Sequence, residues 1–216
     1  MVRSRLVSYM RLHLPQYIPA LLYAAFFASC TPYTLQTART TPKGEFAVGV
    51  ESPNWIDTFP FWFGNTDPAS LSVGIPQVGA TVRYGITERL DVGAHAGVFI
   101  IPHIDIKYRY LGTNSSPWAA SLGAVVGSAG DPTAFLTHVT SYHPKENLAF
   151  YGALLGGYNT YGIADFVQGN VGAQFGSDWR ISTEVGYMVR ISNENVLLTY
   201  GIGVSRNLSS FGRKKK

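Results

Sequence analysis

The chain has 216 residues, enough for one domain, and its composition is unusual for a protein surrounded by water. Charged residues make up only 14% and aromatic residues 13%, and there are 23 glycines. The formal net charge of +4 comes from the two ends of the chain, from Arg3, Arg5 and Arg11 and from the basic residues 213–216. The residues between carry more acidic than basic side chains, so we expect no nucleic-acid partner.

Residues 1–29 predict a cleaved export signal. Arginines in the first 16 residues are followed by an uninterrupted apolar run, 17–29, that ends in small residues. Thirteen helical residues reach roughly 20 Å, short of the ~30 Å hydrocarbon core of a bilayer, so this run is a signal segment rather than a membrane span.

Cys30 follows this run and is the only cysteine of the chain. The tetrapeptide FASC (27–30) resembles the lipobox of bacterial lipoproteins, in which the cysteine is diacylated and becomes the mature N-terminus. The resemblance implies fatty acyl chains such as palmitate on Cys30, and two acyl chains anchor a protein stably. Thr31 resembles the residue after the cysteine in lipoproteins that are sent to the outer membrane. The alternative is an unmodified thiol after an ordinary signal.

The mature chain divides into three parts. Residues 30–43 are polar without a helical period and predict an extended, lipidated tether. Residues 44–208 predict a β-barrel, and residues 209–216 form a basic C-terminal tail. No linker separates a second domain.

Residues 44–208 show short runs of period-two alternation bounded by Gly, Pro, Asn, Asp and Ser. In 179–191, for example, apolar residues from Trp179 to Ile191 alternate with Arg180, Ser182, Glu184 and Arg190. Such repeated alternation predicts an all-β fold, a single transmembrane antiparallel up-and-down β-barrel. We count ten strands, roughly 44–51, 77–86, 89–100, 103–111, 117–127, 133–142, 147–157, 166–176, 179–191 and 195–206. Eight or twelve strands are alternatives, because 53–76 and 127–147 are the hardest segments to parse.

Three tight connections, 86–89, 112–117 and 176–178, fall on the same side of such a barrel. Aromatic residues lie close to them, as expected of a girdle at a membrane interface. These residues are Tyr84, Tyr110, Trp118, Phe175 and Trp179. The alternative is ordinary strand aromatics in a soluble sandwich, which would seldom direct charged side chains toward its core.

The segment RYGITERLDVG (83–93) looks like the periplasmic hairpin of many bacterial outer-membrane β-barrels. The stretch TLQTAR (34–39) through KGE (43–45) resembles the post-cysteine region of barrel-type outer-membrane lipoproteins. These resemblances imply a location in the outer membrane, with lipid anchoring at the N-terminus. They also imply partners: outer-membrane lipids, the lipoprotein export route and the barrel assembly machinery. The oligomeric state stays open.

The inward face of the predicted barrel collects side chains of both charge signs. They are Glu45, Glu51, Arg83, Asp91, His95, Asp105, Lys107, Arg109, Arg180, Glu184 and Arg190. Ten strands give a backbone radius of only about 10 Å, so inward side chains fill most of the lumen. We expect a salt-bridged, plugged or narrow lumen and a structural or envelope role. The alternative is a small channel or a binding protein for a small polar or amphipathic molecule.

The long connection 52–76 is rich in aromatic residues, more than an idle solvent loop needs. We expect it to act as a lid over the barrel mouth or as a binding loop. The residues concerned are Trp55, Phe59, Phe61, Trp62 and Phe63.

A lipid-modifying outer-membrane enzyme is the second alternative, and the residues favour it least. His138 and Ser141 are three residues apart and point to opposite faces of a strand. His138 shares a face with Thr140, and Ser182 shares one with Glu184, but neither pair makes a triad. His103 and His143 each neighbour a proline at a strand end, where we expect them to be solvated. No carboxylate–histidine cluster has the spacing of a metal site, so we expect no enzyme activity, metal or cofactor.

Overall fold

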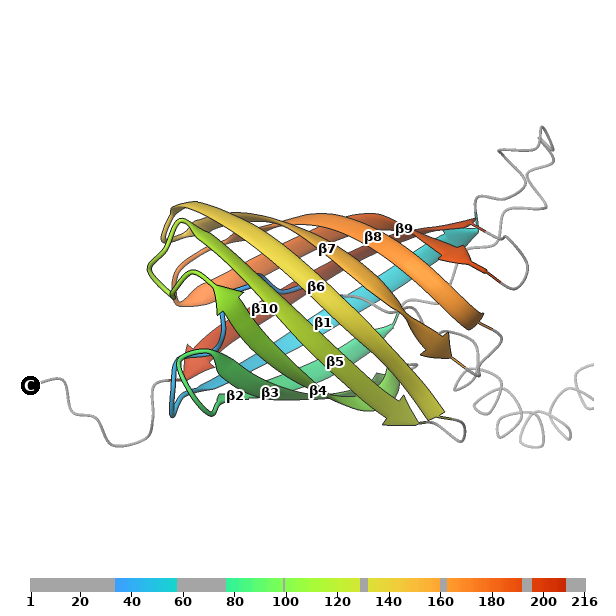
Figure 1. Cartoon of the computed structure of the whole chain (residues 1–216), viewed down its shortest axis with the longest axis horizontal. Coiled ribbons are helices and arrows are strands. Elements are labelled where there is room, and N and C mark those ends of the chain that lie inside the picture. The colour runs from blue at the N-terminus through green and yellow to red at the C-terminus, as the bar shows by residue number, and fades with distance from the viewer. Residues whose placement is uncertain are drawn as a thin grey trace, which may run out of the picture.

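The computed structural model describes residues 34–57, 77–98, 100–128, 132–159, 163–191 and 196–208, and within these ranges it contains ten strands. The strands are β1 (Phe46–Asp57), β2 (Val78–Gly85), β3 (Leu90–Val98), β4 (Ile100–Leu111), β5 (Trp118–Ser128), β6 (Pro132–Lys145), β7 (Leu148–Asn159), β8 (Ile163–Phe175), β9 (Trp179–Arg190) and β10 (Val196–Leu208). Each pairs antiparallel with the next, and β10 pairs with β1, so the sheet closes (Figure 1). The predicted all-β up-and-down barrel of about ten strands is confirmed. Within the same ranges, no helix is long and apolar enough to cross a membrane.

The two ends of the barrel carry different connections. At the turn end, on the left of Figure 1, the segments 86–89, 112–117, 146–147 and 176–178 join the strands. The three tight connections predicted to share one side do share this end. Gly176, with a φ of 102°, shows why a glycine is needed in such a turn, since L side chains rarely adopt that conformation. The loop end, on the right, carries the connections after β1, β3, β5, β7 and β9.

Strand β1 extends beyond the predicted end at residue 51, because its second half continues to pair with β10 after its pairing with β2 has ended. The pairing of β1 with β2 reaches only Glu51 opposite Gly79. Beyond that point β1 continues against β10, with Pro53 opposite Gly201. A proline has no N–H to donate, and it is tolerated where a strand has a neighbour on one side only.

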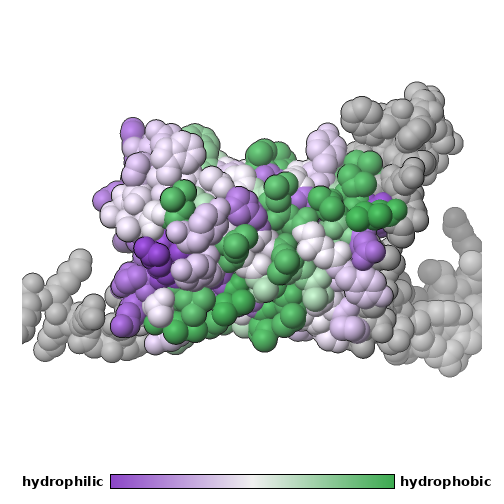
Figure 2. All heavy atoms as spheres, in the orientation of Figure 1, coloured by the Kyte–Doolittle hydropathy of each residue, from purple (hydrophilic) through white to green (hydrophobic). Residues whose placement is uncertain are grey.

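The outer face of the barrel is apolar over its middle. Leu136, Val171 and Ile104 are the most exposed large hydrophobic side chains there, at 68%, 62% and 61%. Figure 2 shows hydrophobic residues gathered across the middle of one face, with more hydrophilic residues toward the turn end. The alternating apolar side chains of the strands therefore point outward, whereas in a soluble protein they point toward the core.

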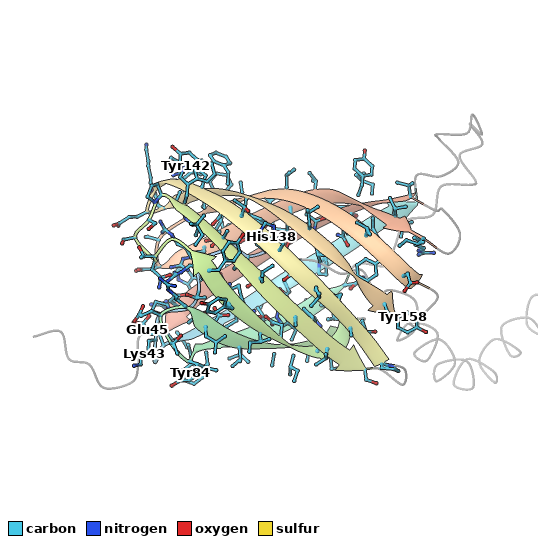
Figure 3. The ribbon with its side chains drawn as sticks, in the orientation of Figure 1. Lys43, Glu45, Tyr84, His138, Tyr142 and Tyr158 are labelled. Atoms are coloured by element: carbon cyan, nitrogen blue, oxygen red, sulfur yellow. The ribbon has the colours of Figure 1, made fainter. Side chains whose placement is uncertain are left out.

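Aromatic side chains lie on the outer face near both ends. Figure 3 shows Tyr84 and Tyr142 at the turn end and Tyr158 at the loop end. At the turn end they form contacts across strands, with Trp118 and Tyr142 at 4.6 Å between ring centroids. All five aromatic residues predicted near the tight turns are more than a third exposed.

The lumen has two layers of different chemistry. Near the loop end, apolar side chains from β6 to β10 face inward and form the apolar layer: Phe135, Val139, Leu155, Phe166, Met188 and Leu197. Phe135 and Phe166 meet edge to face at 5.9 Å. Nearer the turn end, the inward side chains are charged or polar. The expectation of a charged inward face therefore holds for the half nearer the turn end. The other half is mainly hydrophobic, with Asn54, Gln77 and Thr133 as buried polar exceptions.

Candidate functional site

The charged half of the lumen is occupied by residues 34–43 of the same chain, which form the plug. Its backbone starts at the level of Glu184, in the middle of β9, and reaches the turn end, where Lys43 bridges to Gly85 (Figure 1). Most plug side chains are buried: Thr34, Leu35, Thr37, Ala38, Thr40 and Thr41. The segment is extended, as the sequence analysis expects of a tether, but from Thr34 onward it lies inside the barrel.

Glu184 holds the first two residues of the plug. Its carboxylate accepts hydrogen bonds from the backbone N–H of Leu35 at 3.0 Å, from the backbone N–H of Thr34 at 3.2 Å and from the Thr34 hydroxyl. Asn170 donates to the same carboxylate at 2.8 Å. A buried carboxylate needs several donors, and here the plug supplies most of them.

Leu35 sits in a position shaped for it by glycines of β10. Its φ of 41° lies in the left-handed region, which costs a non-glycine residue roughly 1–3 kcal/mol and persists only where the surroundings impose it. A Cβ atom added at Gly201 would lie 3.3 Å from the Leu35 side chain, tighter than ordinary contact. The inward glycine of β10 therefore leaves room for Leu35.

Lys107, on β4, binds the middle of the plug. Its ammonium group donates to Gln36 Oε1 at 2.9 Å, to Arg39 O at 2.9 Å and to Thr37 O at 3.3 Å. Asp91 lies 3.7 Å from the same ammonium group. One buried cation thus satisfies two backbone carbonyls that have no strand partner.

The end of the plug is bound by two side chains and one backbone carbonyl from three parts of the wall. Ala38 N donates to Ser141 Oγ at 3.2 Å, and Thr41 N donates to Asp91 Oδ2 at 2.7 Å. The Thr40 hydroxyl donates to the backbone carbonyl of Glu88 at 2.8 Å. The wall therefore replaces the hydrogen bonds that a neighbouring strand would supply.

A buried ion-pair network lies beside the plug, on β1 to β4. Arg83 donates to Asp91 at 2.5 Å and to Asp105 at 2.7 Å. The His95 ring lies 2.8 Å from Glu51 and 3.0 Å from Asp105. Cations and carboxylates alternate, so each buried charge has a partner of opposite sign.

The remaining residues predicted to face the lumen lie farther from this network. Arg109 is buried at the turn end, where it donates to Asn114 Oδ1 and to the carbonyl of Glu88. Glu45 and Arg180 are half-buried near the turn end, and Arg190 is half-buried at the loop end.

Several residues of the site were not singled out in the sequence. Besides the plug, a buried polar cluster supports Glu184 from β8 and β10. Gln168 donates to Asn170 Oδ1 at 2.8 Å and to the Thr199 hydroxyl at 3.1 Å. This cluster orients Asn170 toward Glu184.

Some predicted features lie outside the described residues. These are the export signal 1–29, the lipidation site Cys30, the aromatic residues Phe59, Phe61, Trp62 and Phe63, and the tail 209–216. Trp55 is part of β1, opposite Thr199 of β10.

The histidines occupy three different environments. His138 is on the outer face, 2.8 Å from the Tyr110 hydroxyl (Figure 3). His143 is buried, 2.9 Å from Ser141 Oγ, so the expectation that it is solvated was wrong. The inward side of β6 removes it from solvent although Pro144 follows it. His103 stacks on His95 with 4.3 Å between ring centroids. Within the described ranges, no three His, Cys, Asp or Glu residues are placed to hold a metal ion.

No protein-family model matches the chain, and no curated protein matches it in sequence. Solved structures with similar folds include outer-membrane barrels and a designed transmembrane β-barrel. An outer membrane channel from Pseudomonas putida F1 has a TM-score of 0.47 and 10% identity, covering 82% of this chain and 100% of that one. The NanC porin has a TM-score of 0.45 and 9% identity, covering 74% and 100%. The KdgM porin has a TM-score of 0.40 and 11% identity, covering 74% and 99%.

The ion-pair network yields a stability prediction. Replacing Arg83 by Met leaves Asp91 and Asp105 buried beside each other without their shared guanidinium. We expect the free energy of unfolding to fall by about 3–5 kcal/mol. The measurement is urea unfolding of refolded protein, followed by tryptophan fluorescence. The matched control is Arg206→Met, which removes an arginine stacked on Trp179 at the outer rim. Equal losses in the two variants would contradict a special role for the buried network.

Proposed function

We propose that this chain is an outer-membrane β-barrel lipoprotein whose lumen is closed and whose role in the cell envelope is structural. The observation that carries the proposal is the plug, because residues 34–41 occupy the charged half of the lumen and are bonded to the wall at every level. Outer-membrane lipids, the lipoprotein export route and the barrel assembly machinery are the partners proposed with it.

The membrane location is supported by the distribution of side chains. Large apolar residues cover the outer face, aromatic residues lie near both ends, and buried charges face inward. In water, a contiguous apolar surface of this extent would aggregate. The barrel closes, and apart from the end of β1 beyond Glu51 its strands are paired on both sides, as β-structure in a bilayer requires.

The closed lumen is supported by the burial of inward side chains in both layers. Phe166, Met188 and Leu197 are at most 1% exposed, so water does not reach the apolar layer. A continuous bore would expose such side chains. The plug closes the other half with polar contacts. A cavity left beside it, lined by Thr81, Arg83 and Arg180 among others, has a volume of only about 90 Å³.

A small channel or a binding protein for a small polar or amphipathic molecule is the second candidate. The polar cavity beside the plug favours it, because its lining offers both donors and acceptors. Passage through the barrel would require both the plug and the apolar layer to move.

We propose that the chain has no catalytic activity. Ser141 and His143 form a buried pair, but Ser141 Oγ also accepts a hydrogen bond from the plug, which covers it. His138 is engaged by Tyr110 on the outer face. Neither arrangement leaves a nucleophile next to an accessible substrate site.

Closure predicts the electrical behaviour in planar bilayers. We expect no current from the wild type, none from Glu184→Ala, which loosens the plug, and none from Phe166→Ala with Met188→Ala, which opens the apolar layer. Combining the three substitutions removes both the plug and the apolar layer as barriers, so single-channel currents should appear only in the triple variant. Asp178→Ala in place of Glu184→Ala is the control, since Asp178 is exposed in the turn 176–178. A steady current from the wild type would refute closure and favour the channel.

The membrane location predicts an asymmetric response to added charge. Leu154→Arg places a charge in the middle of β7 on the outer face. It should reduce the free energy of unfolding, measured in lipid vesicles, by about 2–4 kcal/mol. Ser115→Arg, in the exposed turn 112–117, should change it little. Urea titration in vesicles measures both, and equal small effects would argue against a bilayer around β7.

Lipidation at Cys30 predicts a defined mature N-terminus. Mass spectrometry of the protein from membranes should find an acylated Cys30 as the first residue, and radiolabelled palmitate should be incorporated. Cys30→Ser should abolish incorporation while the barrel still folds, because the described barrel and plug begin at Thr34. An unmodified Cys30 in the membrane fraction would refute the lipoprotein assignment.

A further inference from the structure

Two half-buried arginines at the turn end, Arg39 and Arg180, lack among the described residues the carboxylate partner that Arg83, His95 and Lys107 have. Arg83, His95 and Lys107 each have a carboxylate oxygen within 3.7 Å. Arg39, on the plug, and Arg180, on β9, form no ion pair with any described residue. They line the same cavity, which lies between the plug and the turn end and has a volume of about 90 Å³.

Both guanidinium groups have unused donors. Arg39 donates one Nη2 hydrogen bond to Ser116 O at 2.8 Å, and its Nε is buried without a partner among the described residues. Among the residues that the structure describes, Arg180 makes one long hydrogen bond, 3.4 Å from Nη1 to Asn207 Oδ1. A guanidinium has five N–H donors in a planar fork that matches an oxyanion.

The two cations also raise each other's energy. Burial lowers the pKa of Arg39, and the positive charges of Arg180 and Arg109 lower it further, while Glu146 acts in the opposite direction. Glu146 lines the same cavity, but among the described residues neither Glu146 nor Glu45 forms an ion pair with Arg39 or Arg180. Positive charge gathered in a partly enclosed cavity favours an anion there.

We propose that Arg39 and Arg180 form a binding site for a phosphate group, which ties the plug to the barrel wall. A phosphate group fits better than a carboxylate because its oxygens point in several directions and can accept from two forks that belong to different elements. Asn207 and Gln174 line the same cavity and offer amide donors. The phosphate comes either from free inorganic phosphate or from a lipid headgroup at the barrel mouth.

The site rests on the closed, plugged lumen of the proposed function, and its occupancy has a mechanical consequence. Arg39 belongs to the plug, whereas Arg180 belongs to β9, so one bound anion joins the two parts. The phosphate would then add a charge-assisted attachment at the Arg39 side chain to those that Glu184, Lys107 and Asp91 already provide.

The test is calorimetric titration of full-length refolded protein, in maltoside micelles, with sodium phosphate and with sodium chloride at equal ionic strength. We expect saturable binding of phosphate and none of chloride. Losing one charged fork should weaken binding roughly tenfold or more in Arg180→Gln and in Arg39→Gln. Arg180→Lys keeps the charge without the fork and should lie between. Arg206→Gln is the matched control, because it removes an arginine from the outer rim over Trp179, and it should bind as the wild type does.

A second readout follows the plug itself. Hydrogen exchange of the Thr34 to Ala38 amides should slow when phosphate is bound to the wild type, and it should not respond in Arg180→Gln. Repeating the titration with short-chain phosphatidylglycerol distinguishes a headgroup from free phosphate. Absence of phosphate binding, or equal weakening in Arg206→Gln, refutes the site. A barrel that conducts yet binds phosphate would refute the closed lumen and leave the site, so the two failures are distinguishable.

Discussion

The size of the lumen is the constraint on which the rest of the structure depends. Ten strands about 4.8 Å apart, tilted by about 40°, enclose a backbone radius of only about 10 Å. Such a lumen is too wide for the small inward residues of β10, Gly201 and Gly203, to fill. At the same time, large inward side chains fill most of a lumen of this radius and leave little room for water. The chain resolves this in two ways, with apolar side chains toward the loop end and with its own N-terminal segment toward the turn end.

An extended segment inside a barrel must have its backbone groups satisfied by the wall. The wall supplies Glu184 for the first N–H groups, Lys107 for the middle carbonyls and Asp91 for the last N–H. Each of these is a charged group, and hydrogen bonds to charged groups are the stronger kind. A buried charged group also needs a partner of opposite charge. Asp91 therefore accepts from the plug and forms an ion pair with Arg83 at the same time. The ion-pair network and the plug are therefore one arrangement, since neither is satisfied without the other.

The strand number and the outer face were predictable because alternation is a local property of the sequence. The apolar layer was not predicted, because its residues stand next to outward apolar residues, as Phe166 does beside Val167 and Met188 beside Val189. Such pairs show that both faces are apolar but not which residue faces inward. The plug was not predicted either, since a polar stretch such as TLQTAR (34–39) has the same composition whether it meets water or a polar wall. Its partners lie up to 150 residues away in the chain. His143 was misjudged for a similar reason, because β6 continues past it.

The apolar layer and the plug are held in place by different interactions. The apolar layer is stabilised by side-chain packing within the strands that carry it, so opening it requires the barrel itself to deform. The plug is a separate segment held by individual hydrogen bonds, each of which can be exchanged for water in turn. Leu35, in the left-handed region, gains conformational freedom when the plug leaves. The turn end is thus closed by a segment held through individual hydrogen bonds, while the loop end is closed by side-chain packing.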